Sequence, residues 1–403
     1  MIQHMTAPVR EPVRLMIVAG EASGDAHAAA LVRALCARAP DVRFEFFGAT
    51  GRELRAAGVE TIVEIDQLAI VGLLEIGRAL PRFWRAFGAL KAAARARRPH
   101  AVILVDWPDF NFRLARALHR RGVRVIYYIS PQLWAWRAHR VRQVQRDVDL
   151  LLAILPFEPA WYAARGVRHV EFVGHPLAGA VVPRYDRAEF CRRHALDPAR
   201  PIVALLPGSR HKELTRILPP MLAAARLIAQ AQTGVQLVVA LAPNRAPAEA
   251  APLIAAARAL ADAAFSHSLR VVEHETREAL AAADVAAVAS GTATLETALV
   301  GTPLVVVYKE SALNWHTLGR LINTAHFGLI NLIAGERLAP ELMQNDFTAA
   351  RLAAELLRLL EKDENEAMRA RLRAATAQLG AGGASLRAAD AVLHALNEWR
   401  APR

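Results

Sequence analysis

Short apolar runs alternate with longer helix-like segments along most of this chain, and the runs stop at turns rich in glycine, proline or aspartate. Such runs are typical of strands buried on both faces of a parallel sheet, with the helical segments as crossover connections. One group precedes residue 160 and a second follows residue 200: 15–19, 44–47, 101–105, 123–129, 150–155, then 201–206, 235–241, 269–272, 285–289 and 304–307. The pattern predicts an α/β protein with two Rossmann-like, doubly wound parallel-sheet domains.

The length of 403 residues also favours two domains or more, since a domain typically has ~150 residues. Polar, proline-containing sequence between the two groups of runs suggests a boundary near residue 180. We therefore expect an N-terminal domain at 1–180, a second domain at 181–380 and a last helix within 381–403, after a glycine-rich break. Two such domains in tandem place a cleft between their loop edges.

Composition limits the cellular compartments and the classes of partner that we expect for this chain. The two cysteines, Cys36 and Cys191, lie far apart without a metal-ligand spacing, which argues against a disulfide framework or structural zinc and favours a reducing cytoplasm. No apolar stretch approaches the ~20 residues of a membrane span, and the first run is too short for a signal peptide. The formal net charge of +12 favours acidic partners, such as phosphorylated substrates or anionic lipid surfaces. Nucleic acid is disfavoured because no recognisable module appears.

The run at 101–105 stops abruptly at Asp106-Trp107-Pro108-Asp109. Pro108 biases the backbone of Trp107 away from helical geometry, so the strand must end here and a turn must present Asp106. Functional side chains in parallel sheets gather where strands end. Asp106 is therefore the candidate chemical centre, whereas Asp109 is expected to cap the next helix.

The first apolar run leads into a glycine loop at 20–25. Its glycine spacing differs from the dinucleotide fingerprint, which disfavours a nicotinamide enzyme. Gly24 permits close approach of a ligand, and Ser23 and Asp25 either face that ligand or merely cap the following helix.

The loop at 130–137 contains two tryptophans and an arginine directly after a run. Trp136 is expected to form part of a binding wall, although tryptophans also fill cores.

The segment at 68–98 mixes apolar and aromatic residues with many arginines. This combination is typical of an interfacial helix that faces lipid, and an ordinary amphipathic helix covering the sheet is the alternative. The residues expected at the membrane or at acyl chains are Leu73, Leu74, Arg82, Phe83, Trp84, Arg85 and Phe87.

Two loops in the second half join an apolar run to a helix. Gly208, Ser209 and Arg210 offer backbone N–H groups and a guanidinium to a phosphate, although the lysine of a P-loop is missing. The segment from Ser290 through Gly291 and Thr292 to Glu296 offers hydroxyls at a helix start and a carboxylate for a ribose diol. The alternative for Glu296 is a surface or capping-box role.

Eight motifs in order over nearly the whole chain resemble the lipid-A-disaccharide synthase family. They are GEASGD (20–25), DWPDFN (106–111), SPQLWAWR (130–137), LPFE (155–158), GHPL (174–177), LPGSR (206–210), SGTATLE (290–296) and NLIAGE (331–336). The resemblance implies inverting glycosyltransferases of the GT-B type, with an active site in the cleft between two Rossmann-like domains. It also implies that the last helix returns to the first domain.

The resemblance further implies transfer of 2,3-diacylglucosamine from UDP-2,3-diacylglucosamine to 2,3-diacylglucosamine 1-phosphate (lipid X), releasing UDP and forming a β-1,6-linked disaccharide. Asp106 matches the catalytic aspartate, and Arg210, residues 290–296, Asn331 and Gln344 match donor-side positions. Ser23 and Asp25 match the first glycine loop of the family.

These implications give a consistent set of expectations. No metal is expected, because the spacing of Asp106 and Asp109 is wider than the DxD of metal-dependent sugar transferases and basic loops can replace the cation. No cofactor is expected either. The protein should associate peripherally with the anionic cytoplasmic face of the inner membrane, and a homodimer is left open. The alternatives are another GT-B enzyme, such as a UDP-GlcNAc 2-epimerase, and a non-catalytic nucleotide-sugar or lipid-binding protein.

Overall fold

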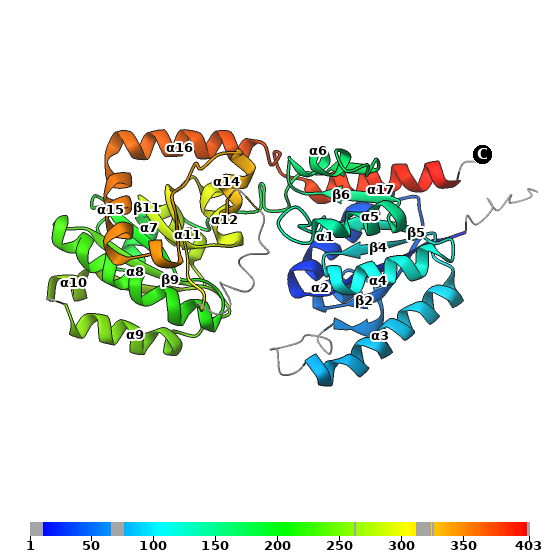
Figure 1. The fold of residues 1–403 in the computed structure, drawn as a ribbon, viewed down its shortest axis with the longest axis horizontal. Coiled ribbons are helices and arrows are strands. Elements are labelled where there is room, and N and C mark those ends of the chain that lie inside the picture. The colour runs from blue at the N-terminus through cyan, green and yellow to red at the C-terminus, as the bar shows by residue number, and fades with distance from the viewer. Residues whose placement is uncertain (1–10, 66–75, 262, 312–323, 325, 401–403) are drawn as a thin grey trace, which may run out of the picture. The chain divides into compact units, whose positions relative to one another are not determined.

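The computed structural model describes residues 11–65, 76–261, 263–311, 324 and 326–400. The chain divides into two compact units: residues 1–176 with 382–403, which we call the first unit, and residues 177–381, the second unit (Figure 1). Each contains one parallel sheet, so the predicted α/β class with two parallel sheets is confirmed. Leu73 and Leu74 lie outside the described residues.

The sheet of the first unit has seven described strands in the order β3-β2-β1-β4-β5-β6-β7, all paired in parallel. Their bounds are β1 Val13–Ala19, β2 Phe44–Thr50, β3 Glu60–Glu64, β4 Ala101–Val105, β5 Arg124–Tyr128, β6 Leu150–Ala153 and β7 Val170–Phe172. Alternate residues of β1 face opposite sides: Leu15 and Ile17 join one core layer, and Met16 and Val18 join the other. Burial of both faces explains why the central strands are continuously apolar.

The helices of this unit are α1 Ala22–Arg38, α2 Arg52–Ala56, α3 Ile76–Arg97, α4 Pro108–His119, the 3₁₀ turn Ala138–Arg140, α5 Val141–Asp147, α6 Glu158–Ala163 and α17 Ala384–Arg400. The last helix, α17, packs against α1 and completes the core layer that contains Leu15 (Figure 1). An ion pair of 3.0 Å between Arg38 and Asp390 joins the exposed sides of the two helices.

The sheet of the second unit has six described strands in the order β10-β9-β8-β11-β12-β13, again all parallel. The strands are β8 Ile202–Leu206, β9 Gln236–Leu241, β10 Leu269–Glu273, β11 Val285–Ala289, β12 Leu304–Tyr308 and β13 Glu341–Met343. The helices are α7 Arg187–Arg193, α8 His211–Ala231, α9 Pro247–Ala259, α10 Ala263–Ser268, α11 Thr276–Ala282, α12 Thr292–Val300, α14 Leu329–Ala334, α15 Ala349–Leu360 and α16 Lys362–Ala377.

Both sheets reverse their strand order once, between β1 and β4 in the first unit and between β8 and β11 in the second. Loops that leave two such neighbouring strands diverge to opposite faces, which opens a crevice at the carboxyl ends of the strands. The loop at 20–25 and the Asp106 turn meet at the first of these positions. The loops at 208–210 and 290–292 meet at the second.

Three short edge strands were not predicted as strands. β3, β7 and β13 each contain at least one glutamate. Edge strands bury less of their surface than central strands, so their sequences lack the continuous apolar run on which the prediction relied.

The expected caps of two helices were wrong. Asp109 lies in the first turn of α4 without a capping hydrogen bond, and neither Ser23 nor Asp25 caps α1, because both lie inside it. The buried carboxylate of Asp25 instead accepts backbone N–H groups at the start of α2, from Gly51 (2.7 Å), Glu53 (2.7 Å) and Leu54 (3.4 Å). Asp25 therefore joins α1 to α2.

Replacing Asp25 by alanine should lower the free energy of unfolding by about 1–3 kcal/mol, because three N–H groups lose their acceptor. Urea unfolding measures this loss, with the exposed Glu21→Ala at the start of the same helix as control. Equal midpoints for the two variants would contradict the capping role.

Candidate functional site

The backbone turns sharply after β4. Asp106 (φ 50°) and Trp107 (φ 49°) both adopt the left-handed conformation, which costs about 1–3 kcal/mol for each non-glycine residue. Trp107 thus avoids right-handed helical geometry, as predicted from Pro108, but through the left-handed region. The carbonyl of Asp106 accepts hydrogen bonds of 2.6 Å from the Tyr127 hydroxyl and from Nδ2 of Asn111. These two side chains hold the strained turn in place.

The carboxyl group of Asp106 is partly buried. Burial raises its pKa above the usual value, while a hydrogen bond from the backbone N–H of Trp107 lowers it. A carboxylate with a raised pKa is a stronger base, which suits the transfer of a proton from a hydroxyl group.

The indole of Trp107 lies across Gly20, where an added Cβ would come within 2.2 Å of the ring. A side chain is thus excluded at position 20 of the glycine loop. Gly24 of the same loop is buried near the end of β4, and a Cβ there would lie 3.8 Å from the carbonyl oxygen of Val105. Ser23 is exposed at the start of α1. The glycine loop and the Asp106 turn therefore lie side by side.

An aromatic cluster extends from this turn to α3. Trp107 stacks on Phe110 with ring centroids 4.1 Å apart, and the rings of Phe83 and Phe87 meet Phe110 edge-on at 4.8 and 5.9 Å. Phe83 and Phe87 are partly buried, whereas Trp84 is 51% exposed. Arg82 and Arg85 are also exposed. One side of α3 therefore covers the sheet, and Arg82, Trp84 and Arg85 are exposed to solvent.

The loop after β5 is fixed at its beginning by buried polar groups. Nε1 of Trp134 donates to the carboxylate of Glu158 (3.1 Å), which also accepts the backbone N–H groups of Ile154 (3.2 Å) and Leu155 (3.0 Å). The hydroxyl of Tyr162 donates to the carbonyl of Pro131 at 2.8 Å. Trp134 thus has a structural role, and the LPFE motif supplies the acceptor that holds it.

The far end of this loop is exposed. Trp136 is 45% exposed, and the guanidinium of Arg137 lies 4.3 Å from the centre of its ring. The carboxylate of Asp109 forms ion pairs with Arg137 (3.0 Å) and Arg140 (2.7 Å). Asp109 therefore joins α4 to this loop. It does not cap the helix because it lies inside the first turn, after the N-cap residue Trp107.

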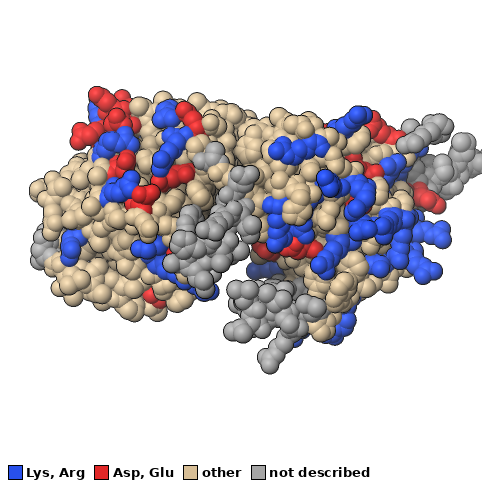
Figure 2. Space-filling model, in the orientation of Figure 1, with Lys and Arg blue, Asp and Glu red and all other residues tan. Residues whose placement is uncertain are grey.

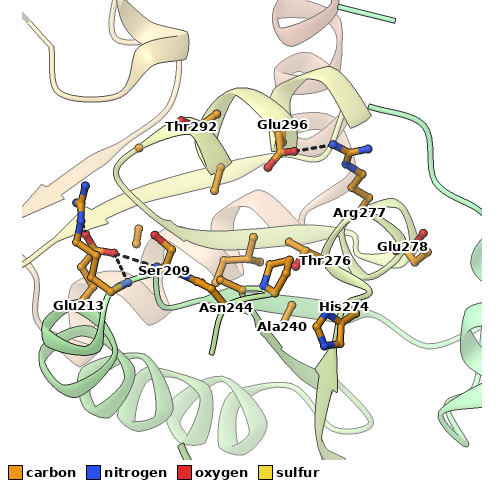
Figure 3. A pocket seen from close by; sticks show the side chains of 18 of the residues that line it. Ser209, Glu213, Ala240, Asn244, His274, Thr276, Arg277, Glu278, Thr292 and Glu296 are labelled. Atoms are coloured by element: carbon orange, nitrogen blue, oxygen red, sulfur yellow. Dashed lines mark hydrogen bonds and ion pairs between the residues drawn. The ribbon is translucent and has the colours of Figure 1, made fainter. Parts of the chain in front are cut away.

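The second unit contains a cavity of about 570 Å³ at the carboxyl ends of β8, β9 and β11 (Figure 3). It brings together the predicted donor-side residues Gly208, Ser209, Arg210, Ser290, Gly291, Thr292 and Glu296. Further lining residues were not predicted, because they follow β9 and β10 without a recognisable motif; they include Asn244, His274, Thr276 and Arg277. The cavity lies at the reversal of strand order, where α/β sheets usually bind ligands.

Glu213 engages the predicted phosphate loop. Its Oε2 accepts the backbone N–H groups of Ser209 (2.9 Å) and Arg210 (3.1 Å), and its Oε1 accepts Nη1 of Arg210 (2.8 Å). Gly208, with φ 107°, makes room for this carboxylate, since a Cβ there would lie 2.5 Å from Oε2. A phosphate that binds these amides must therefore displace Glu213.

The second loop contributes the start of α12. Gly291 adopts φ 150°, and the hydroxyl of Ser290 donates to the carbonyl of Phe327 (3.1 Å). Glu296 points from α12 toward Arg277, with which it forms an ion pair of 3.2 Å (Figure 3). Its carboxylate therefore has a partner at the cavity wall.

Asn331 and Gln344 are not among the residues that line this cavity. Asn331 is fully buried, and its Nδ2 donates to the carbonyl of Ala339 and to Glu341, both at 2.8 Å. Oε1 of Gln344 accepts the backbone N–H of Glu310 at 3.3 Å. These contacts connect α14 and the β12 loop to the strand β13.

Within the described residues, no group of three or more His, Cys, Asp or Glu side chains is arranged to hold a metal ion. No helix in the same part of the chain combines the length and apolar character needed to cross a membrane.

Glu158 generates a prediction about stability. Burial raises its pKa from the usual 4.5 to about 7. The folded protein then retains a proton that the unfolded chain loses between these pH values, so the free energy of unfolding falls as pH rises from about 4.5 to 7, by on the order of 3 kcal/mol. Glu158→Gln should remove this fall. Urea unfolding of both proteins from pH 4.5 to 8 measures it, and parallel pH dependences would contradict the assignment.

Comparisons with known proteins agree with one another. The family model described as lipid-A-disaccharide synthetase matches residues 15–394. Lipid-A-disaccharide synthase of Geobacter metallireducens is 41% identical over 98% of this chain and 100% of its own length. The enzyme of that name from Trichlorobacter lovleyi is 43% identical over 96% and 98%.

Solved structures show the fold. A putative UDP-N-acetylglucosamine 2-epimerase from Listeria monocytogenes has a TM-score of 0.64 at 16% identity, covering 96% of this chain and 97% of its own. A glycosyltransferase from Rickettsia africae has a TM-score of 0.57 at 10% identity, covering 97% and 99%. At these identities the likeness supports the GT-B fold alone, so the epimerase alternative gains nothing from it. The family model and the full-length relatives show that the chain belongs to the lipid-A-disaccharide synthases, the glycosyltransferases of lipid A biosynthesis.

Proposed function

We propose that the protein transfers 2,3-diacylglucosamine from UDP-2,3-diacylglucosamine to lipid X, and that Asp106 is the general base of this reaction. Asp106 accepts the proton of the acceptor's 6-hydroxyl as that oxygen bonds to the anomeric carbon, and the bond from this carbon to the diphosphate breaks. UDP leaves with the electron pair, and the configuration inverts. The observation that carries this proposal is a partly buried carboxylate, with its pKa raised by burial, on a strained turn at the strand reversal of the first unit.

The donor belongs in the cavity of the second unit. The loop at 208–210 and the start of α12 at 291–292 offer N–H groups to the diphosphate, and Arg210 offsets the charge that develops as UDP leaves. The side chain of Arg210 is 81% exposed, so it can turn toward a phosphate. Glu296 is assigned to the ribose diol, for which it must share its carboxylate with Arg277. The first unit then serves the acceptor.

Asp106→Asn should lower kcat about 100- to 10,000-fold, because an amide cannot accept the proton. The Kd for UDP should be unchanged, because the donor cavity lies in the second unit. UDP release and disaccharide formation measure turnover, with Asp41→Asn, an exposed aspartate of the first unit, as control. In the unaltered enzyme, kcat/KM should rise with pH through the raised pKa of Asp106 and then level off. Near-normal turnover of Asp106→Asn would refute the role.

The exposed part of α3 is assigned to an anionic membrane surface, because Arg82, Trp84 and Arg85 are all exposed there. Each arginine should contribute about 1 kcal/mol, or about fivefold in partitioning. Trp84→Ala and the pair Arg82→Gln with Arg85→Gln should therefore reduce sedimentation with phosphatidylglycerol vesicles at low salt. Leu260→Ala, 75% exposed in the second unit, is the control. Unchanged sedimentation would restore the reading of α3 as an ordinary covering helix.

A further inference from the structure

The proposed reaction leaves one anion without a binding group. The acceptor carries a phosphate at its anomeric carbon, and the ring oxygen joins that carbon to C5, which bears the hydroxymethyl group whose 6-hydroxyl meets Asp106. The loops of the second unit are assigned to the donor diphosphate. If the first unit positions the acceptor, it needs cationic donors beside the Asp106 turn.

Two arginines meet this requirement. Arg137 and Arg140 follow β5, the strand next to β4, and both contact the carboxylate of Asp109. Asp109 is three residues beyond Asp106, in the first turn of α4. Its side chain is 63% exposed, whereas that of Arg140 is only 16% exposed. Two guanidinium groups on one solvent-facing carboxylate leave a net positive charge at the first turn of α4, which follows the Asp106 turn in the chain.

A buried tyrosine contacts the Asp106 turn from the neighbouring strand β5. The hydroxyl of Tyr127 donates to the carbonyl of Asp106. Burial raises the pKa of Tyr127 well above its usual value, the charge of Asp106 raises it further, and the charge of Arg140 lowers it. The charges of Asp106 and Arg140 therefore both act on this one hydroxyl.

The arginines are also preorganised. Arg140 lies 5.3 Å from the centre of the Phe112 ring and Arg137 lies 4.3 Å from that of Trp136. Arg137 is held in the left-handed conformation, with φ 59°. The start of the loop is anchored by Glu158 and Tyr162. Guanidinium groups fixed in this way lose little freedom when they bind a phosphate, and their planar forks match its oxygens. Figure 2 shows further basic side chains over α4 and α5 on the same unit, and the basic residues of these two helices, apart from His119, are arginines.

We propose that Arg137 and Arg140 bind the phosphate of the acceptor, with the exposed ring of Trp136 as a wall of the subsite. This inference rests on the proposed function and extends it. The pair holds the sugar with its 6-hydroxyl at Asp106 and selects a phosphorylated sugar over a neutral one. Asp109 keeps the two guanidinium groups together and yields part of their hydrogen bonds to the phosphate.

The test compares two soluble acceptors with short acyl chains, one with the 1-phosphate and one with a 1-O-methyl group in its place. Arg137→Gln and Arg140→Gln should each raise KM for the phosphorylated acceptor about 10- to 100-fold, the loss expected for hydrogen bonds to a charged group. KM for the UDP-sugar should not change, and neither should kcat/KM for the neutral acceptor. Arg116→Gln, an exposed arginine on α4, is the matched control and should behave as the unaltered enzyme.

A binding measurement keeps the test decisive if the neutral acceptor turns over too slowly. In the Asp106→Asn background, calorimetry should show that each arginine variant weakens binding of the phosphorylated acceptor but not of the methyl glycoside. An equal loss for both acceptors would overturn the proposal and assign the pair to loop structure. Unchanged acceptor kinetics with weaker binding to phosphatidylglycerol vesicles would instead assign it to lipid headgroups. No product from either acceptor with the unaltered enzyme would refute the proposed function itself.

Discussion

The first unit depends on the clamp around one carbonyl group, that of Asp106. A backbone with two consecutive left-handed residues that are not glycine is unfavourable by itself. Tyr127 from the neighbouring strand and Asn111 from the following helix both donate to this oxygen. The ring of Trp107 packs so closely on position 20 that only glycine fits there. Strand, helix and glycine loop therefore meet at one turn, and their packing determines where the carboxylate lies.

In the second unit, the proposed phosphate loop at 208–210 is held by an anion rather than by hydrogen-bond donors. The backbone N–H groups of Ser209 and Arg210 donate to the carboxylate of Glu213, in the helix α8 that follows the loop. An anion of the protein itself therefore occupies the place proposed for a phosphate. Such an arrangement avoids unsatisfied N–H groups but makes a diphosphate compete with Glu213. If a diphosphate binds these amides as proposed, its affinity reflects the difference between two anions rather than the strength of one contact.

Local sequence predicted the central strands, the strand ends that carry Asp106 and the 208–210 and 290–296 loops, because burial on both faces and turn residues leave a pattern within a few positions. It did not predict the roles of Asp25, Asp109 or Glu158, whose partners lie on other elements. Hydrogen bonds between distant segments leave no periodicity, so these residues looked like caps or ordinary charges. The aromatic side of α3 was ambiguous for the same reason, since contacts with Phe110 and Trp107 distinguish the partly buried Phe83 from the exposed Trp84.

The position of α17 has a consequence for how the protein is made. Residues 384–400 complete a core layer of the first unit, yet they follow the whole second unit in the chain. During synthesis, the second unit has all its strands and helices before the ribosome reaches α17. The apolar side of α1 that α17 covers stays open to water until then. The first unit can therefore complete its core only after residues 384–400 have been synthesised. A chain that stops before residue 384 would leave this apolar surface exposed to aggregation or to proteases.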